Sequence, residues 1–243
     1  MKGNLLIMLF LSAWLYSAVA QPPAQRQAVI VESMHFLPKA GMADKMEAAV
    51  KAHIARFHPA GPYAAGLRSV DYGVRTGWYV WVMGPASYAA LDPREDQAAH
   101  NDDWNKNVDP LIEKYDPAII FEYDTEMSTG REMLARSDHY DTWAVDVKSN
   151  EMKRFNQIIE QLSKTYASLG NRAFLVYRSQ VHYPGGADVG LVTSFTDYTD
   201  FGSDWGVQQA FEKLYGAGSW DKMMTVWNEV VVDYNEEIRS VVR

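Results

Sequence analysis

Two stretches of this chain, VWVMGPASYAAL at residues 80–91 and GLVTSFTDYTDF at residues 190–201, follow the same pattern. Each opens with a short apolar run and continues into a turn, after which a tyrosine, Tyr88 or Tyr198, stands three residues before a large apolar residue. A pattern that recurs in this way predicts one structural unit repeated along the chain.

The repetition covers most of the chain at a nearly constant spacing. Arg178 lies 110 positions after Arg68, and Tyr198 lies 110 positions after Tyr88. At a spacing of 109, the apolar positions of one predicted helix match those of another: Met46 with Phe155, Val50 with Ile159, and Phe57 with Tyr166. An ordered series of matches with preserved helical periodicity predicts a duplicated unit.

Both halves are predicted to contain the same order of elements, from hydrophobic periodicity and turn signals. In the first half, we expect strands at 28–37, 66–74, 77–84 and 118–124 and helices at 40–58 and 96–115. In the second half, we expect strands at 140–147, 173–182, 188–195 and 237–242 and helices at 150–168 and 206–233. Each half therefore follows β-α-β-β-α-β, the order of a ferredoxin-like unit.

The predicted fold class is α+β, with ferredoxin-like repeats at 28–126 and 139–243 joined by a linker at 127–138. By its element order and its repeat, the chain resembles the dimeric α+β barrel superfamily, which includes antibiotic-biosynthesis-monooxygenase-like domains, haem-degrading monooxygenases and tandem-repeat chlorite dismutases. The resemblance implies that the two sheets close into a barrel with the helices outside, here as an intramolecular dimeric α+β barrel. Such a chain is expected to be a monomer or a weak homo-oligomer. Two independent α+β domains are the alternative.

The first 20 residues have the pattern of a secretory signal peptide. Lys2 precedes an apolar run at 5–19, and Ala18, Val19 and Ala20 form a cleavage site of small residues. We therefore expect a secreted or periplasmic protein. An uncleaved anchor is the alternative, although the run is shorter than the roughly 20 residues that span a bilayer. Because the chain has no cysteine, packing rather than disulfides must stabilise it.

The composition excludes several classes of partner and mechanism. The formal net charge is -8 without a basic cluster, which argues against nucleic acid or an anionic membrane as a partner. Aromatic residues make up 13% of the chain and predict a core or cavity rich in rings. The sequence has no G-x-S-x-G, P-loop, G-x-G-x-x-G or H-E-x-x-H motif, so it lacks the signatures of those hydrolases, nucleotide-binding proteins and metalloproteases.

Side-chain alternation along the strands indicates which residues line the barrel. One face of the second strand of each half is polar, with Arg68 and Tyr72 in the first half and Arg178, Gln180 and His182 in the second. Because a guanidinium inside a barrel requires a partner, these residues predict a site for an anionic or aromatic small molecule. The alternative is that both arginines form ordinary ion pairs with Asp or Glu at the surface.

Three histidines, His35, His100 and His182, are weak candidates for a catalytic base. His35 lies on a mixed face of the first strand that is able to line the barrel. A lone histidine on a strand is more often structural, so the catalytic residues stay unknown at this point. His53 and His58 are five residues apart, a spacing that does not place them on one helix face. They are interpreted as surface or packing residues, and no metal site is predicted.

The resemblance also raises haem as a cofactor. The haem-degrading enzymes need an Asn, Trp and His set, and although His100, Asn101 and Trp104 follow the third strand, the first strand offers no asparagine. The chlorite dismutases need a proximal haem histidine in the second half, where His139 and His182 are poor matches. No cofactor is therefore predicted, and haem is left open.

Two functions remain open, so whether the chain is an enzyme stays undecided. The first is a small-molecule site inside the barrel, for binding only or for cofactor-free oxidation. The second is a non-catalytic exported scaffold whose outer surface binds another protein. A deep cavity lined by the polar residues named above would favour the first, whereas a barrel centre filled by Trp78, Trp81 and Trp143 would favour the second.

Overall fold

The computed structural model describes residues 28–183 and 186–243 of the chain. The predicted signal peptide lies outside the described residues, so export stays a prediction. Among the residues that are described, no helix is both long enough and apolar enough to cross a membrane.

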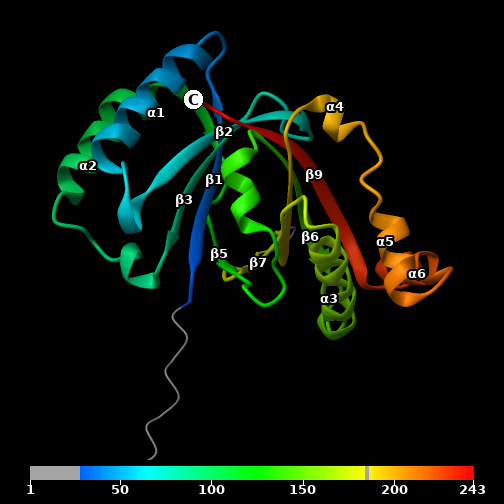
Figure 1. Cartoon of the computed structure of the whole chain (residues 1–243). Helices are drawn as coiled ribbons and strands as arrows, with labels where there is room; N and C mark the ends of the chain where they lie inside the picture. Colours follow the sequence, from blue (N-terminus) through cyan, green and yellow to red (C-terminus); the bar gives the residue numbers. More distant parts are fainter. Residues whose placement is uncertain (1–27, 184–185) are drawn as a thin grey trace, which may run out of the picture.

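Strands and helices follow one another in nearly the predicted order. The strands are β1 (Ile30–Pro38), β2 (Ala65–Gly73), β3 (Tyr79–Ala86), β4 (Ile112–Tyr115), β5 (Ile119–Tyr123), β6 (His139–Val147), β7 (Phe174–Ser179), β8 (Val189–Phe195) and β9 (Val231–Val241). The α-helices are α1 (Ala43–Phe57), α2 (Gln97–Asp103), α3 (Met152–Leu169), α4 (Tyr198–Phe201), α5 (Val207–Tyr215) and α6 (Ser219–Val230). Figure 1 shows α1 and α2 on one flank of the strands and α3, α5 and α6 on the other.

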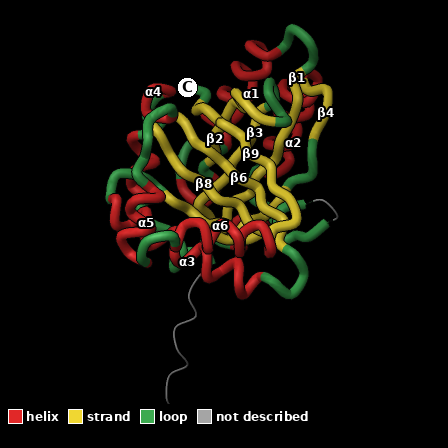
Figure 2. Tube along the Cα trace, turned by 90° about the vertical axis from the view of Figure 1, so that its right-hand side faces the viewer, coloured by secondary structure: helices red, strands yellow, loops and turns green. Residues whose placement is uncertain are grey.

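Eight of the strands close into an antiparallel barrel. The strands of the first half pair in the order β2-β3-β1-β5 and those of the second half in the order β7-β8-β6-β9. The halves meet along both edges, through β2 with β9 and β5 with β7, while the short β4 pairs with β1. Figure 2 shows the strands as one curved sheet with helices around it. The predicted α+β barrel is therefore confirmed, and the two halves are not independent domains.

Two apolar layers hold the helices against the outside of the barrel. On α3, Phe155, Ile159 and Tyr166 share the face that packs on the strands together with α5 and α6. On the other flank, Met46 and Val50 of α1 pack on β2 and β3 in the same way. These positions recur with the helical period. Because the outer faces of the strands serve this packing, their inner faces surround the interior of the barrel.

The predicted helix at 96–115 is broken in the structure. After α2, residues 104–108 form a π-helical turn and residues 109–111 a 3-10 turn, and β4 then begins at Ile112. Pro110 has no N–H to continue a helix, and the residues after it pair with β1 instead.

The predicted helix at 206–233 is also divided. Gly216 and Gly218 separate α5 from α6, and their φ angles of 97° and 72° lie in the region that glycine tolerates and helices exclude. The final strand begins at Val231, earlier than predicted, because its first residues pair with the end of β6.

Asp141, on the outer face of β6, is a buried carboxyl group. Burial raises its pKa to about 7, and the neighbouring carboxylate of Glu236 adds to the effect, while the indole N–H of Trp143 donates to Oδ1 at 2.9 Å and opposes it. Because the pKa is higher in the folded chain than in the unfolded chain, this group contributes stability below about pH 3.9, and the contribution is lost as the pH rises toward 7.

We expect Asp141→Asn to remove this pH-dependent loss. Asparagine keeps an oxygen acceptor for Trp143 but carries no charge, so the variant should be more stable than the original chain by about 1–3 kcal/mol at pH 8 and by much less at pH 5. Urea unfolding at both pH values measures the difference. Asp92→Asn is the control, because Asp92 is exposed. An equal effect of Asp141→Asn at both pH values would contradict the prediction.

Candidate ligand site inside the barrel

A cavity of about 340 Å³ occupies the interior of the barrel. Its walls are largely apolar and aromatic and come from both halves of the chain. They include Val31, Val82, Phe121, Tyr123, Tyr140 and Tyr177. A hollow of this size and lining suits a small organic molecule.

Tyr123 and Tyr177 form an aromatic side of the cavity. They lie on the neighbouring strands β5 and β7, with ring centroids 5.4 Å apart. Gly190 on β8 faces them, and a Cβ at that position would lie 3.6 Å from the Cβ of Tyr177 and 3.8 Å from the ring of Phe121. Burial raises the pKa of Tyr177, so its phenol stays protonated at neutral pH and is able to donate a hydrogen bond.

A cluster of charged side chains lies at another part of the wall. On β9, Arg239 donates from Nε and Nη2 to Oε2 of Glu237, at 2.9 and 2.6 Å. Nε2 of His35 on β1 lies 3.2 Å from the same carboxylate oxygen and 3.1 Å from Nη2 of Arg239. Arg75, in the β2–β3 hairpin, donates to Oε1 of Glu237 at 3.1 Å and to Oδ2 of Asp116 at 2.7 Å. Two guanidinium groups and one imidazole thus converge on the carboxylate of Glu237.

This cluster determines the protonation of its members. Burial alone would raise the pKa of Glu237, but the hydrogen bond with His35 and the charge of Arg239 outweigh it and the pKa is lowered. Burial lowers the pKa of His35, so its ring is neutral at neutral pH. When Nε2–H of this neutral ring is donated to Glu237, Nδ1 keeps its lone pair and is able to accept a proton from a bound molecule.

Arg68 places a cation in the cavity with no carboxylate partner among the described residues. Its Nη1 donates to the backbone oxygen of Leu67 at 2.9 Å, and its guanidinium lies 5.5 Å from the centre of the Tyr140 ring. Gly66 leaves the necessary space, because a Cβ there would lie 2.8 Å from Nη1 of Arg68. A guanidinium with N–H groups to spare in an aromatic surrounding is a natural site for an anion.

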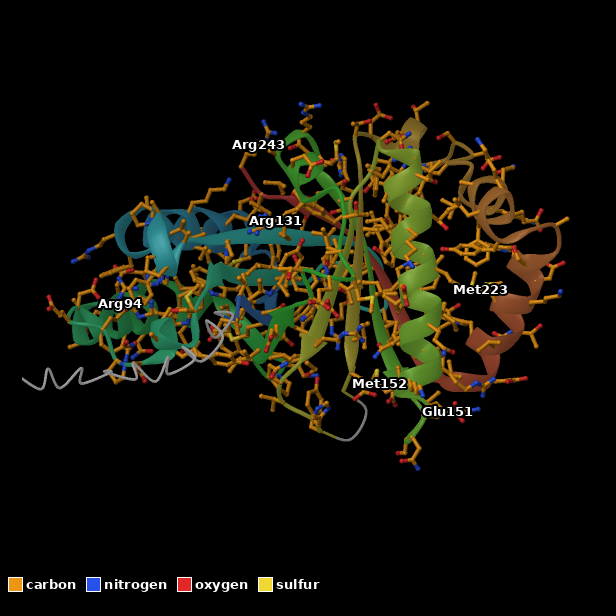
Figure 3. The ribbon with its side chains drawn as sticks, turned by 60° about the horizontal axis from the view of Figure 1, so that its bottom comes forward. Arg94, Arg131, Glu151, Met152, Met223 and Arg243 are labelled. Carbon is orange, nitrogen blue, oxygen red and sulfur yellow. The ribbon has the colours of Figure 1, made fainter. Side chains whose placement is uncertain are left out.

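Charge is unevenly distributed around the cavity. Arg131, in the segment that joins the two halves, also lines it, with its guanidinium 5.2 Å from the centre of the Tyr123 ring. Figure 3 labels Arg131 near the centre of the molecule. Asp146 and Asp233, paired across β6 and β9, form an acidic part of the wall, and burial followed by the nearby carboxylate of Asp188 raises the pKa of Asp146. An anionic ligand would therefore lie toward the arginines.

Of the two arginines predicted to face inward, Arg68 lines the cavity and Arg178 does not. The side chain of Arg178 points to the outside of the barrel, where its Nε and Nη2 both lie 3.1 Å from Oδ2 of Asp124. Tyr177 faces the cavity in its place. The ion pair that was the alternative interpretation is thus what the structure shows for Arg178.

The error comes from a shift of one residue between the two halves. Leu67 on β2 and Val176 on β7 both belong to the apolar layers outside the barrel, and they lie 109 positions apart, whereas Arg68 and Arg178 lie 110 apart. Since successive side chains on a strand point to opposite faces, a shift of one residue turns a side chain from the inside to the outside.

Three other predicted binding residues also lie outside the cavity. Tyr72 is 60% exposed, because the register with β9 shifts between Val70 and Tyr72 and this bulge turns the side chain outward. Gln180 and His182 follow the end of β7, where the alternation of a strand no longer applies, and both are exposed. Nδ1 of His182 lies 3.1 Å from Oδ1 of Asp188, in an ordinary surface pair.

The other histidines are distributed differently from the prediction. His35 lines the cavity, whereas His100 lies outside the barrel next to His53 and His58. The interpretation of His53 and His58 as surface residues is wrong, since they are 1% and 3% exposed, although packing was part of that interpretation. Burial lowers the pKa of His58 to about 4. The spacing argument fails because α1 ends at Phe57, so His58 does not lie on the helix.

Glu237, Arg239 and Arg75 were not among the predicted site residues. A signal for the first two was present, because residues two apart on a strand share a face. Arg75 lies in a hairpin turn, where no periodicity indicates the direction of a side chain.

Tryptophan does not fill the barrel. Trp81 is buried in the layer beneath α1, and the ring of Trp78 lies 5.3 Å from the ammonium of Lys114. Trp143 is among the residues around the cavity, but it packs against the apolar layer beneath α3, α5 and α6 and stacks on Tyr234 at 4.9 Å. The interior therefore stays hollow, which does not favour the scaffold function.

The residues that the second half places around the cavity do not fit haem. His35, on β1 of the first half, is the one histidine among the described residues of the lining. In the second half, His139 pairs with Ser240 at 2.6 Å and His182 is exposed. No described histidine of the second half thus faces the interior as an axial iron ligand.

The fold is similar to that of several solved structures, among them an anthrone oxidase-like protein and a chlorite dismutase. An anthrone oxidase-like protein aligns with a TM-score of 0.52 and 12% identity, covering 90% of this chain and 93% of that chain. Chlorite dismutase from Candidatus Nitrospira defluvii, in complex with imidazole, aligns with a TM-score of 0.55 and 6% identity, covering 88% and 91%. No family model and no curated protein matches the sequence. At these identities the similarity shows the fold alone.

Proposed function

We propose that this chain, which has the fold of the dimeric α+β barrel proteins, binds a small anionic aromatic molecule inside its barrel and oxidises it with molecular oxygen without a cofactor. The observation that carries the proposal is Arg68, a guanidinium in an aromatic cavity without a carboxylate partner among the described residues. A carboxylate or phenolate would satisfy this cation, and the rings of Tyr123 and Tyr177 would pack against the aromatic part of the ligand.

The charged cluster provides the groups that such an oxidation needs. Neutral His35, with Glu237 behind it, takes the proton that leaves an activated CH₂ group of the ligand. Arg68 stabilises the resulting anion. The anion passes electrons to O₂ as a C–O bond forms, and the hydroperoxide then loses water to leave a carbonyl group. Overall, CH₂ and O₂ give C=O and H₂O, so no other reductant is required.

The similarity to an anthrone oxidase-like protein supports this class of reaction. Fold similarity by itself does not assign a substrate, because one fold serves many chemistries. The arrangement of Arg68, His35 and Glu237 around one cavity supports the proposal independently of that protein.

We also propose that the barrel consists of two tandem ferredoxin-like repeats at 28–126 and 139–243. The two strand orders support this, since β2-β3-β1-β5 and β7-β8-β6-β9 correspond strand by strand. Because a single chain already pairs both sheets, we expect a monomer or a weak homo-oligomer.

The proposed function is tested by ligand binding and oxygen uptake with the purified protein. The absorption spectrum and native mass spectrum first show whether a haem, flavin or other molecule copurifies. Intrinsic fluorescence then measures binding of 1-hydroxy-2-naphthoate against its uncharged counterpart 1-naphthol. An oxygen electrode follows oxidation of anthrone, which is uncharged but has an activated CH₂ group and becomes a phenolate when that group loses a proton. We expect preferential binding of the acid and protein-dependent oxygen uptake at a one-to-one ratio to the carbonyl product. Absence of both binding and oxygen uptake would refute the proposed function.

A further inference from the structure

A cluster of three imidazoles lies outside the barrel, between α1 and α2. His53 is on α1, His58 directly follows it, and His100 is on α2. One ring nitrogen from each lies within 4.8 Å of the others, and Nε2 of His58 is 2.9 Å from Nε2 of His100. Figure 1 shows the two helices on the same flank. None of the three histidines lines the barrel cavity, so this cluster is separate from the proposed oxidation site.

The outer ring nitrogens of these histidines are held by acceptors. Nδ1 of His53 lies 2.7 Å from Oδ2 of Asp103, and Nδ1 of His58 lies 2.7 Å from the backbone oxygen of Tyr63. A carboxylate and a carbonyl oxygen accept hydrogen bonds, so both Nδ1 atoms carry the hydrogen. In the neutral rings, the two Nε2 atoms therefore keep their lone pairs. Holding the far nitrogen of an imidazole in this way is how proteins orient metal-binding histidines.

One of these lone pairs has no hydrogen-bond partner. Nε2 of His53 is buried and unpaired within the described part of the chain. Buried polar atoms are nearly always satisfied, so an unpaired one calls for an explanation. The rings of Trp81 and Trp104, with centroids 6.1 and 5.1 Å from that of His53, surround it with apolar atoms. A cation placed among the three histidines would satisfy Nε2 of His53 and Nε2 of His58 together.

The surrounding charges are compatible with a cation at this place. The carboxylate of Asp103 supports His53 directly. Glu32, on the outer face of β1, is near enough to His100 to interact with it electrostatically. Two arginines are also near: Arg94, in the loop before α2, is paired with Asp96 at 2.8 Å and donates to the backbone oxygen of Phe57, and the exposed Arg56 lies 3.5 Å from Asp103.

The geometry points to a site for a divalent transition-metal ion, held by Nε2 of His53, His58 and His100. Three imidazole ligands are typical of zinc, with a fourth position left open for water or another ligand. His100 is the least buried of the three and leaves that position access to solvent. The π-helical turn that begins at Trp104, directly after Asp103, is a rare element that often accompanies functional sites.

Zinc alone is the probe for this proposal. The full chain is stripped with a chelator and titrated with Zn²⁺ against a fluorescent zinc indicator, and Co²⁺ in its place reports the coordination geometry through its visible absorption. We expect one equivalent of zinc with a dissociation constant below roughly 1 μM. His100→Gln should weaken binding by at least about 100-fold. Asp103→Asn removes the negative charge behind His53, where Arg56 and Asn107 also contact Asp103, and should weaken binding by about 10- to 100-fold.

His182→Gln is the matched control, since His182 is exposed and lies in the other half of the chain. This variant should bind zinc as the original chain does, and circular dichroism in the presence of chelator shows that each variant is folded. If the three histidines only pack together, zinc will bind with well below one equivalent, or with an affinity that neither His100→Gln nor Asp103→Asn changes. Either result overturns the proposal, and neither bears on ligand binding inside the barrel.

Discussion

Glu237→Gln is expected to lower the free energy of unfolding by about 3–5 kcal/mol. The carboxylate of Glu237 is 3% exposed and is the shared acceptor for Arg239 and Arg75. Without its charge, Arg239 would be a largely buried cation with no carboxylate partner among the described residues, whereas Arg75 would keep Asp116. Removing one member of a buried ion pair is costly because the other member stays desolvated and uncompensated.

The same interaction predicts the effect of acid. Because the pKa of Glu237 is lower in the folded chain than in the unfolded chain, the stability it contributes is present above about pH 4.3 and is lost as the pH falls below that value. The original chain should therefore lose stability on acidification more steeply than Glu237→Gln, which has nothing to protonate at this position.

Chemical denaturation at pH 7 measures the loss, and Glu229→Gln is the matched control. Glu229 also pairs with an arginine, Arg154, but both side chains are largely exposed, so the change should cost about 0–1 kcal/mol. The double variant Glu237→Gln with Arg239→Gln should recover part of the stability, since no unpaired buried charge remains at Arg239. If Glu237→Gln lowers the free energy of unfolding no more than Glu229→Gln does, the pairing of Glu237 with Arg239 and Arg75 does not stabilise the fold.

The order of elements was predictable because it depends on local periodicity. The apolar positions of α1 and α3 recur with the helical period, and the matched spacing of Met46 with Phe155 relates one helix to the other. By contrast, β4 is four residues long and exists through its pairing with β1, so no local pattern distinguishes it from the end of a helix.

The candidate site was predictable only in part because it depends on register and on contacts distant in sequence. Arg68 follows the expected alternation, but the one-residue shift between the halves places Arg178 on the outer face. His58 and His100 are 42 residues apart and meet only when α1 and α2 pack side by side. A helix-face rule, which compares positions within one helix, has no means of detecting that contact.

Arg68→Met and Arg178→Met are expected to have opposite consequences, although both remove one guanidinium from a strand. Arg178 pairs with Asp124, and each side chain is about one-fifth exposed. Its loss leaves that carboxylate without a cationic partner, so we expect destabilisation by about 1–3 kcal/mol and little change in ligand affinity. Arg68 has no carboxylate to leave behind among the described residues, so Arg68→Met should leave stability unchanged or raise it.

Ligand affinity should fall in Arg68→Met and stay nearly unchanged in Arg178→Met. If Arg68 binds the anionic group, Arg68→Met removes a charge-assisted hydrogen bond of about 1.5–3 kcal/mol, which corresponds to roughly a 10- to 150-fold weaker affinity for 1-hydroxy-2-naphthoate. Affinity for the uncharged 1-naphthol should change little, because methionine keeps a similar length and apolar contact with Tyr140. Thermal unfolding of both variants with and without each ligand measures all of these quantities. Marked destabilisation by Arg68→Met in the absence of ligand, together with unchanged affinity for the acid, would mean that this arginine is structural and would remove the main support for an anion site in the barrel.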